Sequence, residues 1–150
     1  MPFGVLLVDD NASHVQLLTV LIELEEDLVV LGVATDGQAG VVRAAELQPD
    51  LIVSDIDMPR LDGVCATPLY RKAAPRAAVV LMSSLEPETA TELAARAGAD
   101  LYIDKGTGVD TTIGLLRRVV RVKGSPEVID LRNPTRDLTD PIDLRGGRTD

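Results

Sequence analysis

The sequence is poor in aromatic residues, cysteine and histidine. Only 2% of its 150 residues are aromatic, and it has one cysteine and one histidine. One cysteine excludes an internal disulfide, and one histidine leaves no convincing Ser-His-Asp or Cys-His catalytic arrangement. With so few aromatics, the core has to be built from Val, Leu, Ile and Ala, which is typical of a sheet covered by Ala-rich helices.

Long apolar segments and basic clusters are also missing. No apolar run approaches the roughly 18 to 20 residues needed to span a bilayer. The N-terminal MPFGVLLVDD lacks the charged flank and long apolar stretch of a signal peptide. The net charge of −9 has the wrong sign for a surface that follows nucleic-acid phosphates. We therefore expect a cytoplasmic protein with no membrane insertion and no direct nucleic-acid binding.

Short apolar runs alternate with amphipathic segments as far as residue 124. Strands are predicted at 5–8, 28–34, 51–54, 78–82 and 101–103, and helices from Asn11 or Ser13 to about Leu24 and at about 38–47, 64–74, 87–97 and 109–122. Pro68 interrupts the third helical segment, which should therefore be short or kinked. The alternation predicts one α/β domain at 1–124, with a doubly wound five-stranded parallel sheet, helices on both faces and right-handed crossovers.

The segment 125–150 has a different composition. It contains three prolines, a Gly-Gly pair and many charges, and its apolar residues show no helical period. We expect a flexible, disordered tail. The string Ile-Asp-Leu-Arg occurs twice in it, at 129–132 and 142–145. A duplicated binding motif would explain the repeat, but chance recurrence in a low-complexity tail is the preferred interpretation.

Polar residues follow four of the predicted strands. Asp9 and Asp10 follow the first strand, Asp55 the third, Ser83 the fourth and Lys105 the fifth. Parallel strands all end at the same edge of a sheet, where open α/β folds place their ligands. Three carboxylates, a hydroxyl and an ammonium group should therefore share one pocket.

The chemistry of this group of residues favours phosphoryl transfer. Clustered carboxylates repel one another, and a set of oxygen ligands without Cys or His favours Mg²⁺ over zinc. A metal ion, an ammonium group and a hydroxyl can together stabilise the negative charge of a phosphoryl group in transfer. The obvious nucleophile is then a carboxylate, and Asp55 is the central one.

These residues, with the segments DIDMPRLDG at 55–63 and AGADLYIDK at 97–105, resemble the receiver domains of bacterial two-component response regulators. The resemblance covers residues of about 4 to 123 and implies five helices and a flavodoxin-like strand order, 2-1-3-4-5. It implies that Asp55 is the phosphoacceptor and that Asp10 is a direct Mg²⁺ ligand. It further implies that Asp9 supports the metal through water and that the Asp57 backbone carbonyl completes the coordination.

The resemblance also implies a switch. Ser83 and Lys105 would bind the aspartyl phosphate, and Tyr102 would occupy the aromatic switch position. The phosphoryl group would come from a sensor histidine kinase or a phosphotransfer protein. Phosphorylation would alter the surface of the fourth helix, fifth strand and fifth helix, and an unknown downstream protein would read that change.

Three functions remain open from the sequence. The leading hypothesis is a stand-alone receiver that switches protein interactions and performs only its own phosphorylation and dephosphorylation, so it is not an enzyme in the usual sense. Asp55 and Asp57 also resemble the DxD of haloacid-dehalogenase-like hydrolases, which would make the protein a Mg²⁺-dependent phosphatase. The third is a phosphorylation-independent scaffold. His14 is interpreted here as an ordinary surface residue of a helix.

Overall fold

The computed structural model describes residues 2–123, and it confirms the predicted alternation of strands and helices. The elements in chain order are β1 (Phe3–Val8), α1 (Ala12–Glu23), β2 (Leu28–Ala34), α2 (Gly37–Leu47), β3 (Leu51–Asp55), α3 (Gly63–Ala73), β4 (Ala78–Ser83), α4 (Pro87–Ala97), β5 (Leu101–Asp104) and α5 (Val109–Val122). The predicted tail at 125–150, with its repeated string, lies outside the described residues. Within 2–123, no helix has the length and apolar character needed to cross a membrane.

The five strands form one parallel sheet in the order β2-β1-β3-β4-β5, as the resemblance implied. Strand pairing brings β1 and β3 together in the middle of the sheet, with Val8 opposite Ser54. On the other side of β3, β4 pairs with β5 so that Ser83 lies opposite Asp104. The carboxyl ends of β1, β3, β4 and β5 therefore lie next to one another.

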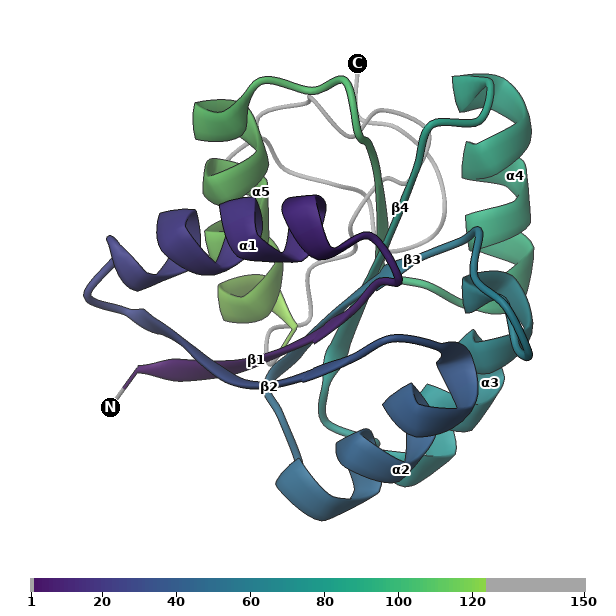
Figure 1. The fold of residues 1–150 in the computed structure, drawn as a ribbon, viewed down its shortest axis with the longest axis horizontal. Helices are drawn as coiled ribbons and strands as arrows, with labels where there is room; N and C mark the ends of the chain where they lie inside the picture. The colour runs from purple at the N-terminus through teal and green to yellow at the C-terminus, as the bar shows by residue number, and fades with distance from the viewer. Residues whose placement is uncertain (1, 124–150) are drawn as a thin grey trace.

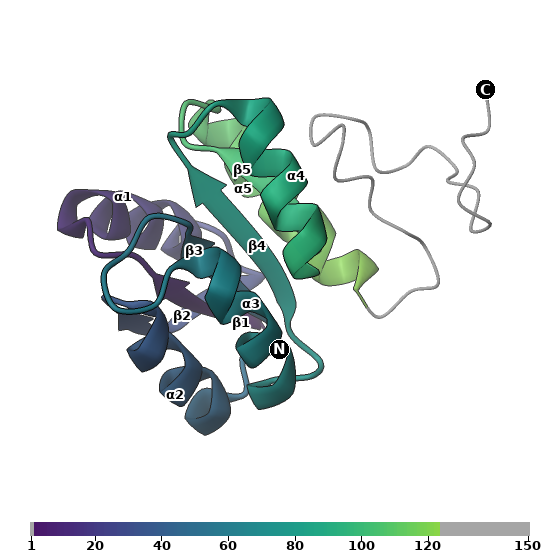
Figure 2. The same ribbon diagram turned by 90° about the vertical axis from the view of Figure 1, so that its right-hand side faces the viewer.

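Helices cover both faces of the sheet, and a separate apolar cluster fills each interface. Figure 1 shows α1 and α5 on one side of the sheet and α2, α3 and α4 on the other. Because successive strand side chains point to opposite faces, Val5 and Leu7 of β1 pack with the first group, while Leu6 and Val8 pack with the second. A 90° turn shows α4 lying along β4 and β5 (Figure 2). The sheet is thus held rigidly from both sides.

Helix α3 begins against the end of β3 and has the same length as the predicted segment 64–74. The Asp62 side chain caps it by accepting a hydrogen bond from the Cys65 backbone N–H at 2.8 Å. Pro68 was expected to make the helix short or kinked; α3 runs through 11 residues and continues past Pro68, so it is not shortened, and the kink stays a prediction. Pro68 is exposed; water can therefore satisfy the carbonyl that loses its helical partner there.

Gly63 allows α3 to start close to the backbone of β3. Its N–H donates to the Ile56 carbonyl at 2.9 Å. A Cβ at this position would overlap the carbonyl oxygen of Asp55. By contrast, a Cβ at Gly114 in α5 would have no heavy atom within 4 Å.

We therefore expect Gly63→Ala to lower the free energy of unfolding by about 1–3 kcal/mol, because the backbone next to Asp55 has to shift. The matched change Gly114→Ala should raise it by about 0.5–1 kcal/mol, because alanine loses less backbone entropy in a helix. Urea unfolding followed by circular dichroism measures both. Equal effects at the two glycines would contradict the close approach at Gly63.

Candidate functional site

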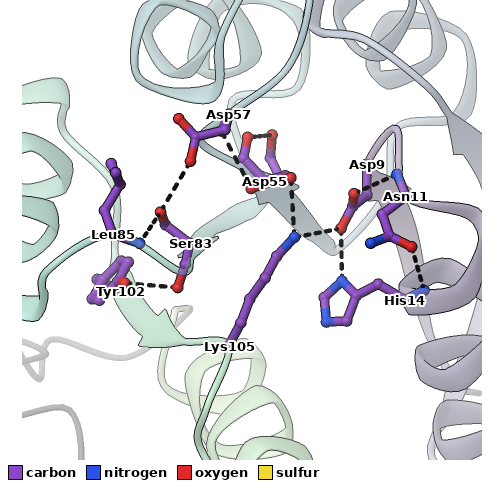
Figure 3. A network of polar contacts seen from close by, with 10 residues as sticks. Asp9, Asn11, His14, Asp55, Asp57, Ser83, Leu85, Tyr102 and Lys105 are labelled. Carbon is purple, nitrogen blue, oxygen red and sulfur yellow. Dashed lines mark hydrogen bonds and ion pairs between the residues drawn. The ribbon is translucent and has the colours of Figure 1, made fainter.

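The predicted polar residues converge at the carboxyl edge of the sheet. Figure 3 shows Asp9, Asp55 and Lys105 pointing toward one another from the ends of β1, β3 and β5. The Lys105 ammonium nitrogen lies 3.0 Å from Oδ2 of Asp55 and 3.3 Å from Oδ2 of Asp9. Both carboxylates are buried, and the lysine is half-buried. One cation is therefore shared between two carboxylates that lie largely out of water.

This arrangement affects the three groups differently. Burial alone would lower the pKa of Lys105, but its hydrogen bond to Asp55 and the charges of Asp55 and Asp9 raise it above the usual value. In Asp55 the charged form is disfavoured. Burial, together with repulsion from Asp9, raises its pKa despite the contact with Lys105. Burial would also raise the pKa of Asp9. The hydrogen bonds from His14 and the Asn11 N–H, together with the charge of Lys105, outweigh that effect and lower the pKa. Asp55 is thus the carboxylate whose ionisation is least favoured.

Three acidic residues lie close enough to share one metal ion. Asp9, Asp10 and Asp55 each offer a carboxylate oxygen, and these oxygens lie within 4.8 Å of one another. Oxygens that bind one Mg²⁺ at about 2.1 Å are themselves about 3 to 4 Å apart. Asp10 is exposed, which leaves room for the waters that Mg²⁺ retains. The donor set fits the ion, while the role of the Asp57 carbonyl stays a prediction.

Ser83 and Tyr102 lie on the other side of Asp55 and are linked through one carbonyl group. The Tyr102 hydroxyl donates to the Ser83 carbonyl at 3.1 Å, and the Lys105 backbone N–H donates to the same carbonyl at 2.9 Å. Burial, with the nearby charge of Asp104, raises the pKa of Tyr102 to about 12, so the hydroxyl keeps its proton. The ring is buried and points inward (Figure 3).

The Ser83 hydroxyl faces Asp57 in this structure. Its oxygen accepts a hydrogen bond from the Leu85 N–H at 2.9 Å and donates to Oδ2 of Asp57 at 3.4 Å. The Asp57 backbone N–H in turn donates to Oδ1 of Asp55 at 3.2 Å. The contact between the Asp57 carboxylate and Ser83 was not foreseen from the sequence, which offers no spacing rule for it.

One residue near the site was missed. His14 was interpreted as an ordinary surface residue, which is wrong, because its Nδ1 lies 2.6 Å from Oδ2 of Asp9 and its side chain is only 16% exposed. The side chain of a residue in the first helical turn leans back toward the helix N-terminus. A histidine five positions after a strand-ending aspartate was therefore the signal that could have found this contact.

Comparison with known proteins identifies the family. A family model described as the response regulator receiver domain matches residues 5–117. The chain belongs to this family. The shared architecture agrees: the crystal structure of the response regulator domain of Thermotoga maritima CheB has a TM-score of 0.74 at 34% identity, covering 81% of this chain and 98% of that one. A chain of the CheX-CheY-BeF3-Mg+2 complex from Borrelia burgdorferi has a TM-score of 0.71 at 27% identity. The match covers 81% of this chain and 90% of that one.

Curated relatives of this receiver domain include proteins named protein-glutamate methylesterase/protein-glutamine glutaminase. The Thermotoga maritima protein is 41% identical over 84% of this chain. The Maricaulis maris protein is 46% identical over 54% of it. The chain spans only 35% of the length of the first and 20% of the second. The match is therefore to the receiver part of longer proteins.

Replacing Asp55 with asparagine should stabilise the metal-free receiver domain at neutral pH. The pKa of Asp55 is higher in the folded state than in the unfolded state. Above the folded-state pKa the carboxylate is ionised in both states, and its ionisation then lowers the free energy of unfolding. Asp55→Asn removes this cost, so its free energy of unfolding should exceed that of wild type at neutral pH. The gain should shrink as falling pH protonates wild-type Asp55. Urea titrations in EDTA across this pH range measure the difference.

Exposed Glu26→Gln, which changes the net charge equally, is the control for the asparagine variant. It should show little change. An Asp55→Asn variant less stable than wild type at neutral pH would contradict the predicted cost of the carboxylate.

Proposed function

We propose that this receiver domain accepts a phosphoryl group on Asp55 in a Mg²⁺-dependent reaction. The observation that carries the proposal is the convergence of Asp9, Asp10, Asp55 and Lys105 at the end of the sheet. Asp55 is the nucleophile because its carboxylate contacts Lys105 and lies close to the other two acids, and because the residue ends the central strand β3. The donor is a phosphohistidine on a sensor histidine kinase or a phosphotransfer protein.

The transfer requires only positioning and charge stabilisation. A carboxylate oxygen of Asp55 attacks phosphorus, so that an O–P bond forms while the N–P bond of the donor breaks and its electron pair returns to the imidazole nitrogen, which is then protonated. Asp9, Asp10, Asp55 and the Asp57 carbonyl would hold Mg²⁺. When bound, the ion supplies neutralisation of the charge on the phosphoryl oxygens. Lys105, which contacts Asp55 at 3.0 Å, contributes a second positive charge.

Phosphorylation then acts through Ser83 and Tyr102. The new phosphoryl oxygens are stronger acceptors than the single Asp57 oxygen that Ser83 now faces at 3.4 Å. Ser83 would turn its hydroxyl toward them. Because the Ser83 carbonyl accepts from both Tyr102 and the Lys105 N–H, this rearrangement would reach β5 and the surfaces of α4 and α5. A downstream protein that prefers that surface would read the state.

The output of the switch has two candidate forms. The sequence suggested a stand-alone receiver that acts on a separate protein, and this stays a prediction. The names of the relatives favour a second form, in which a receiver of this kind controls a protein-glutamate methylesterase. The family match weighs against the DxD phosphatase. The scaffold alternative depends on whether Asp55 reacts.

Intact-protein mass after incubation with acetyl phosphate and Mg²⁺ tests the proposal. We expect a single phosphoryl adduct on the wild-type chain, and none with Asp55→Asn or after EDTA treatment, because nucleophile and metal are then missing. Asp62→Asn is the matched control, since it neutralises a carboxylate of the same loop while asparagine still caps α3. It should keep the adduct.

A wild-type chain that forms no adduct and fails to bind beryllofluoride would contradict the proposal. That result would favour the phosphorylation-independent scaffold. An adduct that survives in Asp55→Asn would instead move the phosphorylation site to another residue.

A further inference from the structure

The histidine missed by the sequence analysis is built into the acidic pocket. His14 belongs to the first turn of α1, and its backbone N–H donates to the side chain of the N-cap residue Asn11 at 3.2 Å. This bond fixes the turn from which the imidazole extends. The ring then reaches back over the helix N-terminus, and Nδ1 approaches Oδ2 of Asp9 at 2.6 Å (Figure 3). The resemblance to receiver domains assigned no role to this position.

Both oxygens of Asp9 have partners. Oδ1 accepts the Asn11 backbone N–H at 2.8 Å, while Oδ2 is shared by His14 and by Lys105 at 3.3 Å. The two partners of Oδ2 are not equivalent. Lys105 also contacts Asp55 and would move to a phosphoryl group there, whereas His14 touches only the Asp9 side of the pocket. His14 can therefore hold Asp9 in both states of the switch.

We propose that His14 is a positioning residue for the metal site: its Nδ1–H donates to Oδ2 of Asp9 and fixes the direction in which that carboxylate faces Mg²⁺. This inference rests on the metal-binding part of the proposed function. An ionised carboxylate only accepts hydrogen bonds, so Nδ1 carries the proton. Hydrogen-bond partners of metal-binding carboxylates orient the ligand, and losing one typically weakens metal binding about 10- to 100-fold.

The alternative is that His14 merely fills space at the start of α1. The burial of Asp9 argues against this, because a buried carboxylate requires donors to offset its lost hydration. A space-filling role predicts that an apolar side chain of similar size would serve equally well.

Three substitutions of His14 separate these roles. His14→Asn places an amide N–H where Nδ1 now lies, His14→Gln places it where Nε2 lies, and His14→Leu keeps bulk without a donor. Isothermal titration of the full chain with Mg²⁺ gives the dissociation constant of each. We expect about tenfold weaker binding for His14→Leu and His14→Gln. His14→Asn should stay within about threefold of wild type. Gln16→Leu, at an exposed position of the same helix, is the control.

The proposal is overturned if His14→Leu binds Mg²⁺ as tightly as wild type, if His14→Gln rescues and His14→Asn does not, or if wild type binds no Mg²⁺. Thermal unfolding of each variant shows that a weaker site is not simply an unfolded one. The same samples are treated with acetyl phosphate at saturating Mg²⁺. A wild-type adduct with unchanged metal affinity in His14→Leu overturns only this inference. The expected affinity pattern without an adduct overturns only the phosphorylation of Asp55.

Discussion

The rest of the site depends on one shared contact, that of the Lys105 ammonium group with Asp9 and Asp55. Two buried carboxylates this close together repel each other, and burial makes the repulsion stronger than it would be in water. A single lysine offsets part of it. Asp9 also accepts hydrogen bonds from His14 and the Asn11 N–H, which lower its pKa, whereas burial and the charge of Asp9 leave Asp55 with a raised pKa. The site therefore has an unfavourable charge that a cation can relieve.

Strand register explains why these groups meet at all. Val8 pairs with Ser54, so the next residues of the two strands, Asp9 and Asp55, leave the sheet side by side. At the other end of the cluster, Asp104 of β5 pairs with Ser83, which places Lys105 just beyond the sheet edge. A shift of one residue in either pairing would send these side chains to the wrong face. The apolar clusters on both faces, which fix the register, therefore also fix the site.

The sequence could predict the strand ends, because the apolar runs determine them. Parallel topology then brings the residues that follow these ends to one edge of the sheet: Asp9, Asp10, Asp55, Ser83 and Lys105. The sequence could not predict contacts that a side chain makes with a neighbouring element of the fold. His14 contacts Asp9 only because the Asn11 cap sets the start of α1. The continuation of α3 past Pro68 could not be predicted for a similar reason, since the exposure of one helix face depends on the whole packing and not on the proline.

The pocket divides into two halves that are held by different contacts. On one side, Asp9 is held by His14 and by the Asn11 N–H, all at the junction of β1 and α1, and nothing there needs to move when Asp55 reacts.

On the other side, the Ser83 hydroxyl accepts a hydrogen bond from the Leu85 N–H at 2.9 Å but has only a long contact to Asp57, and the Ser83 carbonyl accepts from both Tyr102 and the Lys105 N–H. Asp55 lies between the two halves. A change of charge there would act on the Ser83 hydroxyl, because its contact to Asp57 is long, whereas Asp9 is held by short hydrogen bonds.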